Sequence, residues 1–89
     1  GGVQRAGRVH LLGTPYADAA RERLVRALAL RARLGPDQAE AAIDRALAAR
    51  TPGVPPFSET AAALRAARKP ADLLRAARQL HAIERTLTR

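Results

Sequence analysis

The sequence predicts an all-α protein, a small four-helix bundle. Alanine and arginine, both strong helix formers, occupy twenty-two and fifteen of the 89 positions. Apolar residues recur at intervals of three and four in four separate stretches, as they do on the buried face of a helix. Helix-breaking residues separate these stretches at Gly35-Pro36, within residues 51–56 and at Pro70.

The first helix is expected over about residues 15–34. Thr14 is suited to cap it and Pro15 to take its first position, while Gly35-Pro36 ends it. Its apolar face, with Val25 at the edge, consists of Ala17, Ala20, Leu24, Ala27 and Leu28.

The residues before this helix are expected to lie outside the bundle. Residues 1–13 are interpreted as an N-terminal arm or a cut linker, and residues 14–89 as one helical domain. Residues 8–12 are the candidate for a short extended arm that packs onto the helices.

The second helix is expected over about residues 37–50. Asp37 and Glu40 fit an Asp-x-x-Glu capping box at its start. Its apolar stripe consists of Ala39, Ile43, Ala46 and Leu47. Residues 51–56 follow as a non-helical connector, because their three prolines lack backbone donors and push the preceding residues into extended geometry.

Two further helices complete the bundle. Ser58 is suited to cap a third helix over about residues 59–68, whose inward side chains are Ala61, Leu64 and Ala67. Pro70 and Asp72 open a fourth helix over about residues 70–88. Its stripe is the clearest in the chain and consists of Leu73, Leu74, Ala77, Leu80, Ile83 and Leu87.

Two charged residues fall on apolar faces. Arg31 follows Leu28 by three positions in the first stripe, and Glu84 follows Leu80 by four in the last. Because a single buried charge is costly, we expect Arg31 and Glu84 to form an ion pair, or one of them to reach solvent at a helix end. The functional interpretation is a polar site in the bundle, and the structural one is an internal ion pair.

The core is expected to be small and aliphatic. Phe57 and Tyr16 are the only aromatic residues, and alanine buries little area. Phe57 is therefore either a plug in the core or an anchor for a partner. The chain contains no cysteine, which excludes a disulfide framework and a thiolate metal site.

No catalytic, cofactor-binding or metal-binding residue is predicted, and the chain is interpreted as not being an enzyme. His81 and Glu84 lie one helical turn apart, but a metal site in a bundle needs several such ligands on facing helices. Ser58 has no histidine near it in sequence to act as a base. The glycines form no phosphate-binding loop.

The net charge of +8 raises the question of nucleic-acid or anionic-lipid binding. The excess charge is spread over several segments, and asparagine, a common reader of bases, is absent. The residues that are candidates for phosphate or partner contact on an exposed face are Arg21, Arg23, Arg26 and Arg33. The alternative is a solvated helix face with pairs such as Glu22 and Arg26.

From residue 20 onward, the order of these signals resembles that of a known family. Its segments are Arg31-Ala-Arg-Leu-Gly35, Thr51-Pro-Gly-Val-Pro-Pro56, Ala67-Arg-Lys-Pro-Ala-Asp72 and Leu73-Leu-Arg-Ala-Ala-Arg-Gln-Leu80 followed by His-Ala-Ile-Glu84-Arg. Over about residues 20–85 the chain resembles the C-terminal cytoplasmic helical tail of an uncharacterised bacterial membrane-protein family, a domain of unknown function often encoded beside MoxR-type AAA+ ATPases.

The resemblance implies a setting and no binding residues. In that family the tail follows the last membrane span of a larger chain whose extracytoplasmic part resembles a glutamine-amidotransferase or sugar-binding fold. The resemblance implies that this chain is a fragment, located at the cytoplasmic face of the inner membrane. The partner that the resemblance implies is a protein, the neighbouring AAA+ ATPase system or its adaptor. A second copy of the chain is the other protein partner considered. The chain itself contains no apolar run of about 20 residues.

Three functional hypotheses follow from the sequence. The first is a non-enzymatic helical interaction module that binds a protein partner. The second is a basic helical module that binds nucleic acid or anionic lipid without sequence preference, and salt titration distinguishes it from the first. The third, a small metalloenzyme, requires an ion bound at His81 and Glu84.

Overall fold

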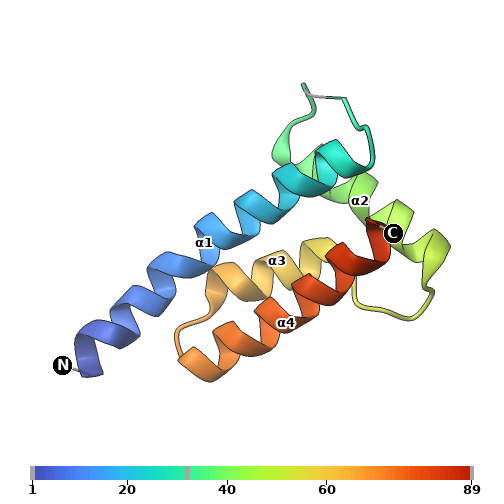
Figure 1. Ribbon diagram of the computed structural model, residues 1–89. Coiled ribbons are helices and arrows are strands. Elements are labelled where there is room, and N and C mark those ends of the chain that lie inside the picture. The colour runs from blue at the N-terminus through green and yellow to red at the C-terminus, as the bar shows by residue number, and fades with distance from the viewer. Residues whose placement is uncertain (1, 32, 89) are drawn as a thin grey trace.

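The computed structural model describes the backbone of residues 2–31 and 33–88 and the side chains of residues 11–31 and 33–88 (Figure 1). Within these residues the chain forms helices and no strand, which confirms the all-α bundle. The helices are α1 (Gly2–Ala27), α2 (Pro36–Arg50), α3 (Phe57–Ala66) and α4 (Pro70–Leu87).

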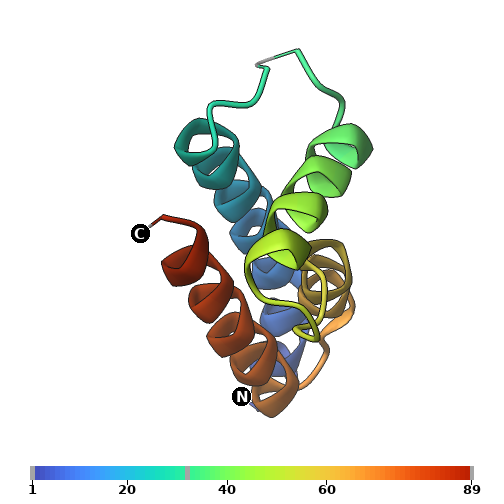
Figure 2. The same ribbon diagram turned by 90° about the vertical axis from the view of Figure 1, so that its right-hand side faces the viewer.

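The helices pack as a hairpin against one long helix. α3 and α4 run antiparallel to each other beside α1, and α2 crosses near the C-terminal end of α1 (Figures 1 and 2). Every pair of helices is in contact. The early turns of α1 project beyond the other helices (Figure 1), and the molecule measures 43 × 28 × 19 Å.

The start of α1 differs from the sequence prediction. The helix begins at Gly2 and contains Pro15 in its interior, so the extended arm predicted over residues 8–12 is wrong. Proline has a φ value that suits a helix, and the break predicted from it rests on one missing donor and a local clash. Packing outweighs this cost, because Gly13 is buried directly against α3.

The contact at Gly13 brings two helix backbones together. A Cβ atom added at Gly13 would overlap the carbonyl oxygen of Leu64 in α3 and lie 2.7 Å from its carbonyl carbon. Only glycine permits this approach without a shift of one helix. The residue interpreted as part of an arm therefore fixes the crossing of α1 and α3.

The end of α1 also differs from the prediction, since the helix stops at Ala27 rather than near residue 34. Ala29 has a positive φ of 53°. Its N–H donates to the Arg26 carbonyl at 3.1 Å, and the N–H of Leu30 donates to the Val25 carbonyl at 2.9 Å. These two bonds form a Schellman motif. This motif could not be predicted from the sequence, because alanine occupies the position where glycine is usual.

The N-caps of α2 and α3 also differ from the predicted ones. Gly35 is the N-cap of α2, and its N–H donates to Oε1 of Gln38 at 3.3 Å, so Asp37 and Glu40 form no capping box. Ser58 lies inside α3, which begins one residue earlier. Its N–H donates to Asp44 of α2 at 2.9 Å, and its hydroxyl donates to the other carboxylate oxygen at 2.5 Å.

The core contains most of the predicted apolar positions. The buried cluster consists of Ala17, Ala20, Leu24, Ile43, Leu47, Phe57, Ala61, Leu64, Ala76, Leu80, Ile83 and Leu87. Phe57 is 0% exposed and acts as the core plug, so its interpretation as a partner anchor is wrong. Two predicted core residues are exposed: Ala27 ends α1, and Leu74 lies on the outer side of α4.

A network of four charged side chains joins α1, α2 and α3. Arg65 donates to Asp18 at 3.1 Å and to Glu40 at 3.0 Å, and Arg21 lies 3.0 Å from Asp18 and 3.5 Å from Glu40. Burial opposes the charge of Arg65, but its hydrogen bonds to Glu40 and Asp18 outweigh this effect and raise its pKa. Among the described residues, no buried side-chain polar atom lacks a hydrogen-bond partner.

Candidate partner-binding groove

An apolar groove lies between the early part of α4 and the middle of α1. It has a volume of about 470 Å³ and is lined by Leu12, Tyr16, Pro70, Leu73, Leu74 and Ala77. Apart from the Tyr16 hydroxyl, these side chains carry no polar group. The groove therefore suits an apolar ligand or side chain rather than a polar substrate.

The helices place these side chains by simple register. Leu12 and Tyr16 are four residues apart in α1, as are Leu73 and Ala77 in α4, so each pair lies on one helix face. Leu74 is rotated by about 100° from Leu73 and forms the outer lip of the groove. Pro70 occupies the start of α4, where its missing N–H costs nothing.

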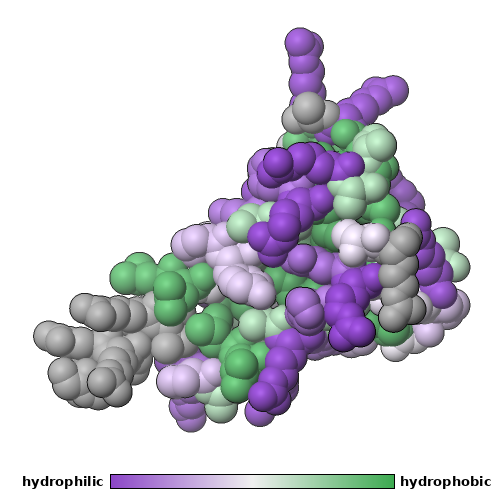
Figure 3. Space-filling view, in the orientation of Figure 1, coloured by the Kyte–Doolittle hydropathy of each residue, from purple (hydrophilic) through white to green (hydrophobic). Residues whose placement is uncertain are grey.

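Large apolar side chains are exposed around this groove. Leu11, Leu12, Tyr16 and Leu74 are 69%, 57%, 42% and 52% exposed. Figure 3 shows hydrophobic side chains gathered at the lower left of the described surface, with hydrophilic side chains above them, to their right and along the lower edge. Single exposed leucines are ordinary, whereas several of them beside a groove form a candidate binding surface.

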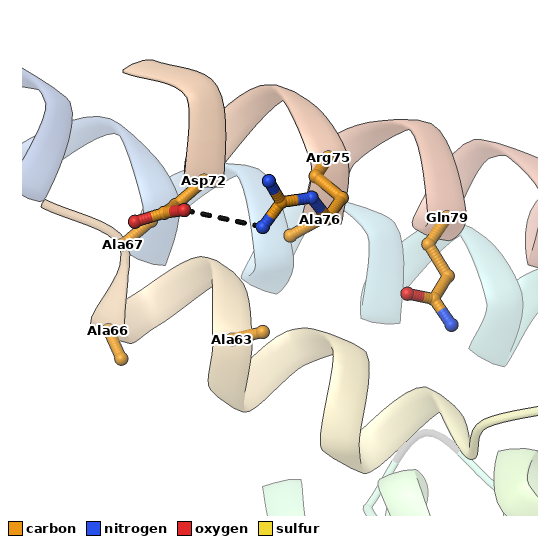
Figure 4. A pocket seen from close by; sticks show the side chains of 7 residues that line it. All are labelled: Ala63, Ala66, Ala67, Asp72, Arg75, Ala76 and Gln79. Atoms are coloured by element: carbon orange, nitrogen blue, oxygen red, sulfur yellow. Dashed lines mark hydrogen bonds and ion pairs between the residues drawn. The ribbon is translucent and has the colours of Figure 1, made fainter. Parts of the chain in front are cut away.

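A second hollow, between α3 and α4, is a poorer candidate for binding a ligand. It has a volume of about 320 Å³ and is lined by Ala63, Ala66, Ala67, Asp72, Arg75, Ala76 and Gln79 (Figure 4). Arg75 donates to Asp72 at 3.4 Å, so its two charged groups are paired with each other. The remaining lining is mainly alanine, which gives a ligand little area to contact.

A third hollow lies between the C-terminal part of α1 and the start of α2. It has a volume of about 350 Å³ and is lined by Arg21, Glu22, Val25, Arg26, Arg31, Leu34, Pro36 and Ala39. Arg21 is held there by Asp18 and Glu40 of the charge network. Acidic and basic side chains are mixed in this hollow, which does not select one ligand class.

The predicted ion pair of Arg31 and Glu84 is replaced by another. Nε and Nη2 of Arg23 donate to the two carboxylate oxygens of Glu84 at 3.2 and 2.7 Å. These bonds raise the pKa of Arg23 against the effect of burial. Arg31 is exposed beyond the end of α1, as the alternative in the prediction allowed. Because α1 ends at Ala27, Arg31 does not lie on the apolar helix face that its spacing from Leu28 predicted.

The other predicted contact residues are dispersed. Arg21 belongs to the charge network, Arg23 is paired with Glu84, and Phe57 is buried, while Arg26 and Arg33 are exposed away from the apolar groove. The groove was not predicted from the sequence. The one signal for it was the adjacent pair of leucines at the start of the last stripe, since a narrow stripe cannot bury both.

His81 and Glu84 do not form a ligand pair. His81 is exposed, and both oxygens of Glu84 accept hydrogen bonds from Arg23. In the described part of the chain, no three His, Cys, Asp or Glu side chains gather as a metal site would require.

Comparisons with known proteins give no relative. No family model, no curated protein and no solved structure matches the chain. None of the described helices is long and apolar enough to cross a membrane. The groove is therefore interpreted from its own chemistry.

A double-mutant cycle tests the partner of Glu84. We expect Arg23→Gln and Glu84→Gln to be coupled by about 0.5–1 kcal/mol, because the pair is bidentate but Arg23 is half exposed and screened by solvent. Arg31→Gln and Glu84→Gln should be additive within about 0.3 kcal/mol. The measurement is the free energy of unfolding in urea. Stronger coupling of Glu84 to Arg31 than to Arg23 would contradict the observed pairing.

Proposed function

We propose that this protein is a non-enzymatic helical interaction module that binds an apolar segment of a protein partner in the groove between α1 and α4. The observation that carries the proposal is the exposure of Leu12, Tyr16 and Leu74 around one apolar hollow. An apolar patch of this kind is what a partner helix or strand covers on binding.

The expected strength of this contact is modest. Burying a large apolar side chain completely contributes about 1.5–3 kcal/mol. Leu12, Tyr16 and Leu74 are each about half exposed, so covering all three contributes roughly 3 kcal/mol before the cost of association. A dissociation constant of 1 mM corresponds to about 4 kcal/mol. We therefore expect a transient complex in which other contacts assist the apolar ones.

The family resemblance supports a setting for this module. Under the proposal it belongs to a larger membrane protein and works at the cytoplasmic face of the inner membrane. The AAA+ ATPase system encoded beside members of that family is then the first partner to test.

Nucleic-acid binding is the weaker alternative. Of the four arginines predicted for phosphate contact, Arg21 and Arg23 are paired with carboxylates, so only Arg26 and Arg33 remain exposed for phosphates without breaking a pair. A nucleic acid would also leave the leucines around the groove exposed, since it has no apolar side chains to place among them.

Site-specific photocrosslinking tests the proposed function. A benzophenone amino acid replaces Leu74 in the chain produced in its own cells, and a control chain carries it at Ala49, which is exposed on α2 and does not line the groove. We expect a discrete protein adduct from position 74 only. The crosslinked protein, once purified, should bind the chain about tenfold more weakly after Leu74→Asp. Equal adducts from both positions, or nucleic-acid adducts alone, would contradict the proposal.

A further inference from the structure

We infer that the groove selects an acidic amphipathic segment, whose apolar side chains enter the groove and whose carboxylates lie along the outer face of α4. This inference rests on the proposed function, because it names the kind of partner that the groove accepts. The juxtaposition that carries it is a single stripe on α4 that begins at the lip of the groove and continues as basic side chains.

The stripe consists of Leu74, Arg78, His81 and Arg85. These residues are spaced by four, three and four positions, so they project from one side of α4. All four are exposed. At a rise of 1.5 Å per residue, the distance along the helix from Leu74 to Arg85 is about 16 Å. A segment of two or three helical turns has the length to follow it.

The two arginines of the stripe are available to an incoming anion. α4 contains two carboxylates, and both are used: Asp72 pairs with Arg75, and Glu84 pairs with Arg23. Among the residues that the structure describes, Arg78 and Arg85 have no ion-pair partner. Their guanidinium groups can therefore each accept a carboxylate without breaking an existing pair.

Charge also distinguishes between the candidate ligands for the groove and the stripe. A second copy of the chain would bring together two molecules of net charge +8, which repel each other. A nucleic acid could pair its phosphates with the arginines but would leave the leucines exposed to water. An acidic amphipathic segment can pair with the arginines and also cover the leucines. A segment with projecting side chains fills the hollow between the two helices better than a flat lipid surface would.

The stripe also adds charged contacts and a direction of binding, which the apolar contact alone does not provide. Carboxylates that approach Arg78 and Arg85 add charge-assisted contacts at the rim of the groove. Such contacts accelerate encounter and fix the direction in which a segment lies. The direction is set here because the apolar end of the stripe is at Leu74 and the basic end is at Arg85.

A selection from random peptides tests this inference. A library of 16-residue peptides displayed on phage is selected on the full chain and counter-selected on its Leu74→Asp variant. We expect the enriched peptides to contain apolar residues at helical spacing followed by Asp or Glu. The double variant Arg78→Gln/Arg85→Gln should bind them about fivefold to tenfold more weakly at 50 mM salt, and this difference should shrink at 500 mM.

The matched control is Arg26→Gln/Arg33→Gln, which removes the same charge from exposed positions outside the groove and the stripe. It should weaken binding less than twofold. Enriched peptides without acidic residues, or equal losses in both double variants, would overturn the inference while the Leu74 dependence still supported the groove. If no enriched peptide depended on Leu74, the proposed function itself would be wrong. Tighter binding to phosphatidylserine vesicles than to any peptide would assign the surface to lipid and overturn the inference.

Discussion

Replacing Gly13 with alanine is expected to destabilise the protein by about 2 kcal/mol. Helix propensity alone predicts the opposite sign, because alanine is better than glycine inside a helix by about 1 kcal/mol. The added Cβ, however, would overlap the carbonyl of Leu64, and overpacking against a rigid backbone costs about 3 kcal/mol. The overlap is therefore the larger effect, and α1 and α3 must move apart.

The measurement is urea unfolding followed by circular dichroism at 222 nm. Gly35→Ala is the matched control, because a Cβ there meets nothing within 4 Å and the φ of −64° suits alanine. We expect this control to change the free energy of unfolding by less than about 1 kcal/mol, which reflects only its N-cap position. A Gly13→Ala variant as stable as the unaltered chain would show that α1 and α3 do not meet at this point.

Replacing Phe57 with alanine should have the largest effect of any truncation in the core. The side chain is fully buried, and removing such an aromatic ring costs about 3–5 kcal/mol. A domain of 89 residues has a total stability of about 4–13 kcal/mol. We therefore expect Phe57→Ala to lower the unfolding midpoint steeply or to leave part of the population unfolded at 25 °C.

The control for Phe57 is the other aromatic residue. Tyr16 is 42% exposed at the groove, so Tyr16→Ala should cost only about 1–2 kcal/mol of stability. The same change should weaken partner binding, which separates the two roles. A Phe57→Ala variant as stable as the unaltered chain would show that Phe57 is not part of the core.

Much of the fold follows from local patterns in the sequence. The apolar spacing of three and four identifies the helices and most of the core, including Leu24, Ile43 and Leu80, because a helix must bury one face. The proline-rich segment over residues 51–56 separates two helices whatever the rest of the chain does. The charge of +8 and the absence of cysteine also need no structure.

The boundaries of α1 were harder to predict, for a physical reason. Pro15 is usually a helix start, and its cost inside a helix is offset here by contacts with α3 that no local pattern contains. Ala29 adopts the conformation in which glycine is usual, so the end of the helix carries no sequence signal. At Pro15 the contacts that matter are tertiary, whereas at Ala29 the helix ends through local hydrogen bonds that the residue type does not reveal.

The sequence by itself determined an all-helical chain with a small aliphatic core, a spread positive charge and no recognisable catalytic motif. Only the tertiary structure decided which charges meet, as Glu84 meets Arg23 instead of Arg31, and which apolar side chains remain exposed, as Leu74 does. The reason is that helix periodicity is a property of neighbouring residues, whereas ion pairs and grooves depend on how helices distant in sequence cross. The groove between α1 and α4 exists because of that crossing.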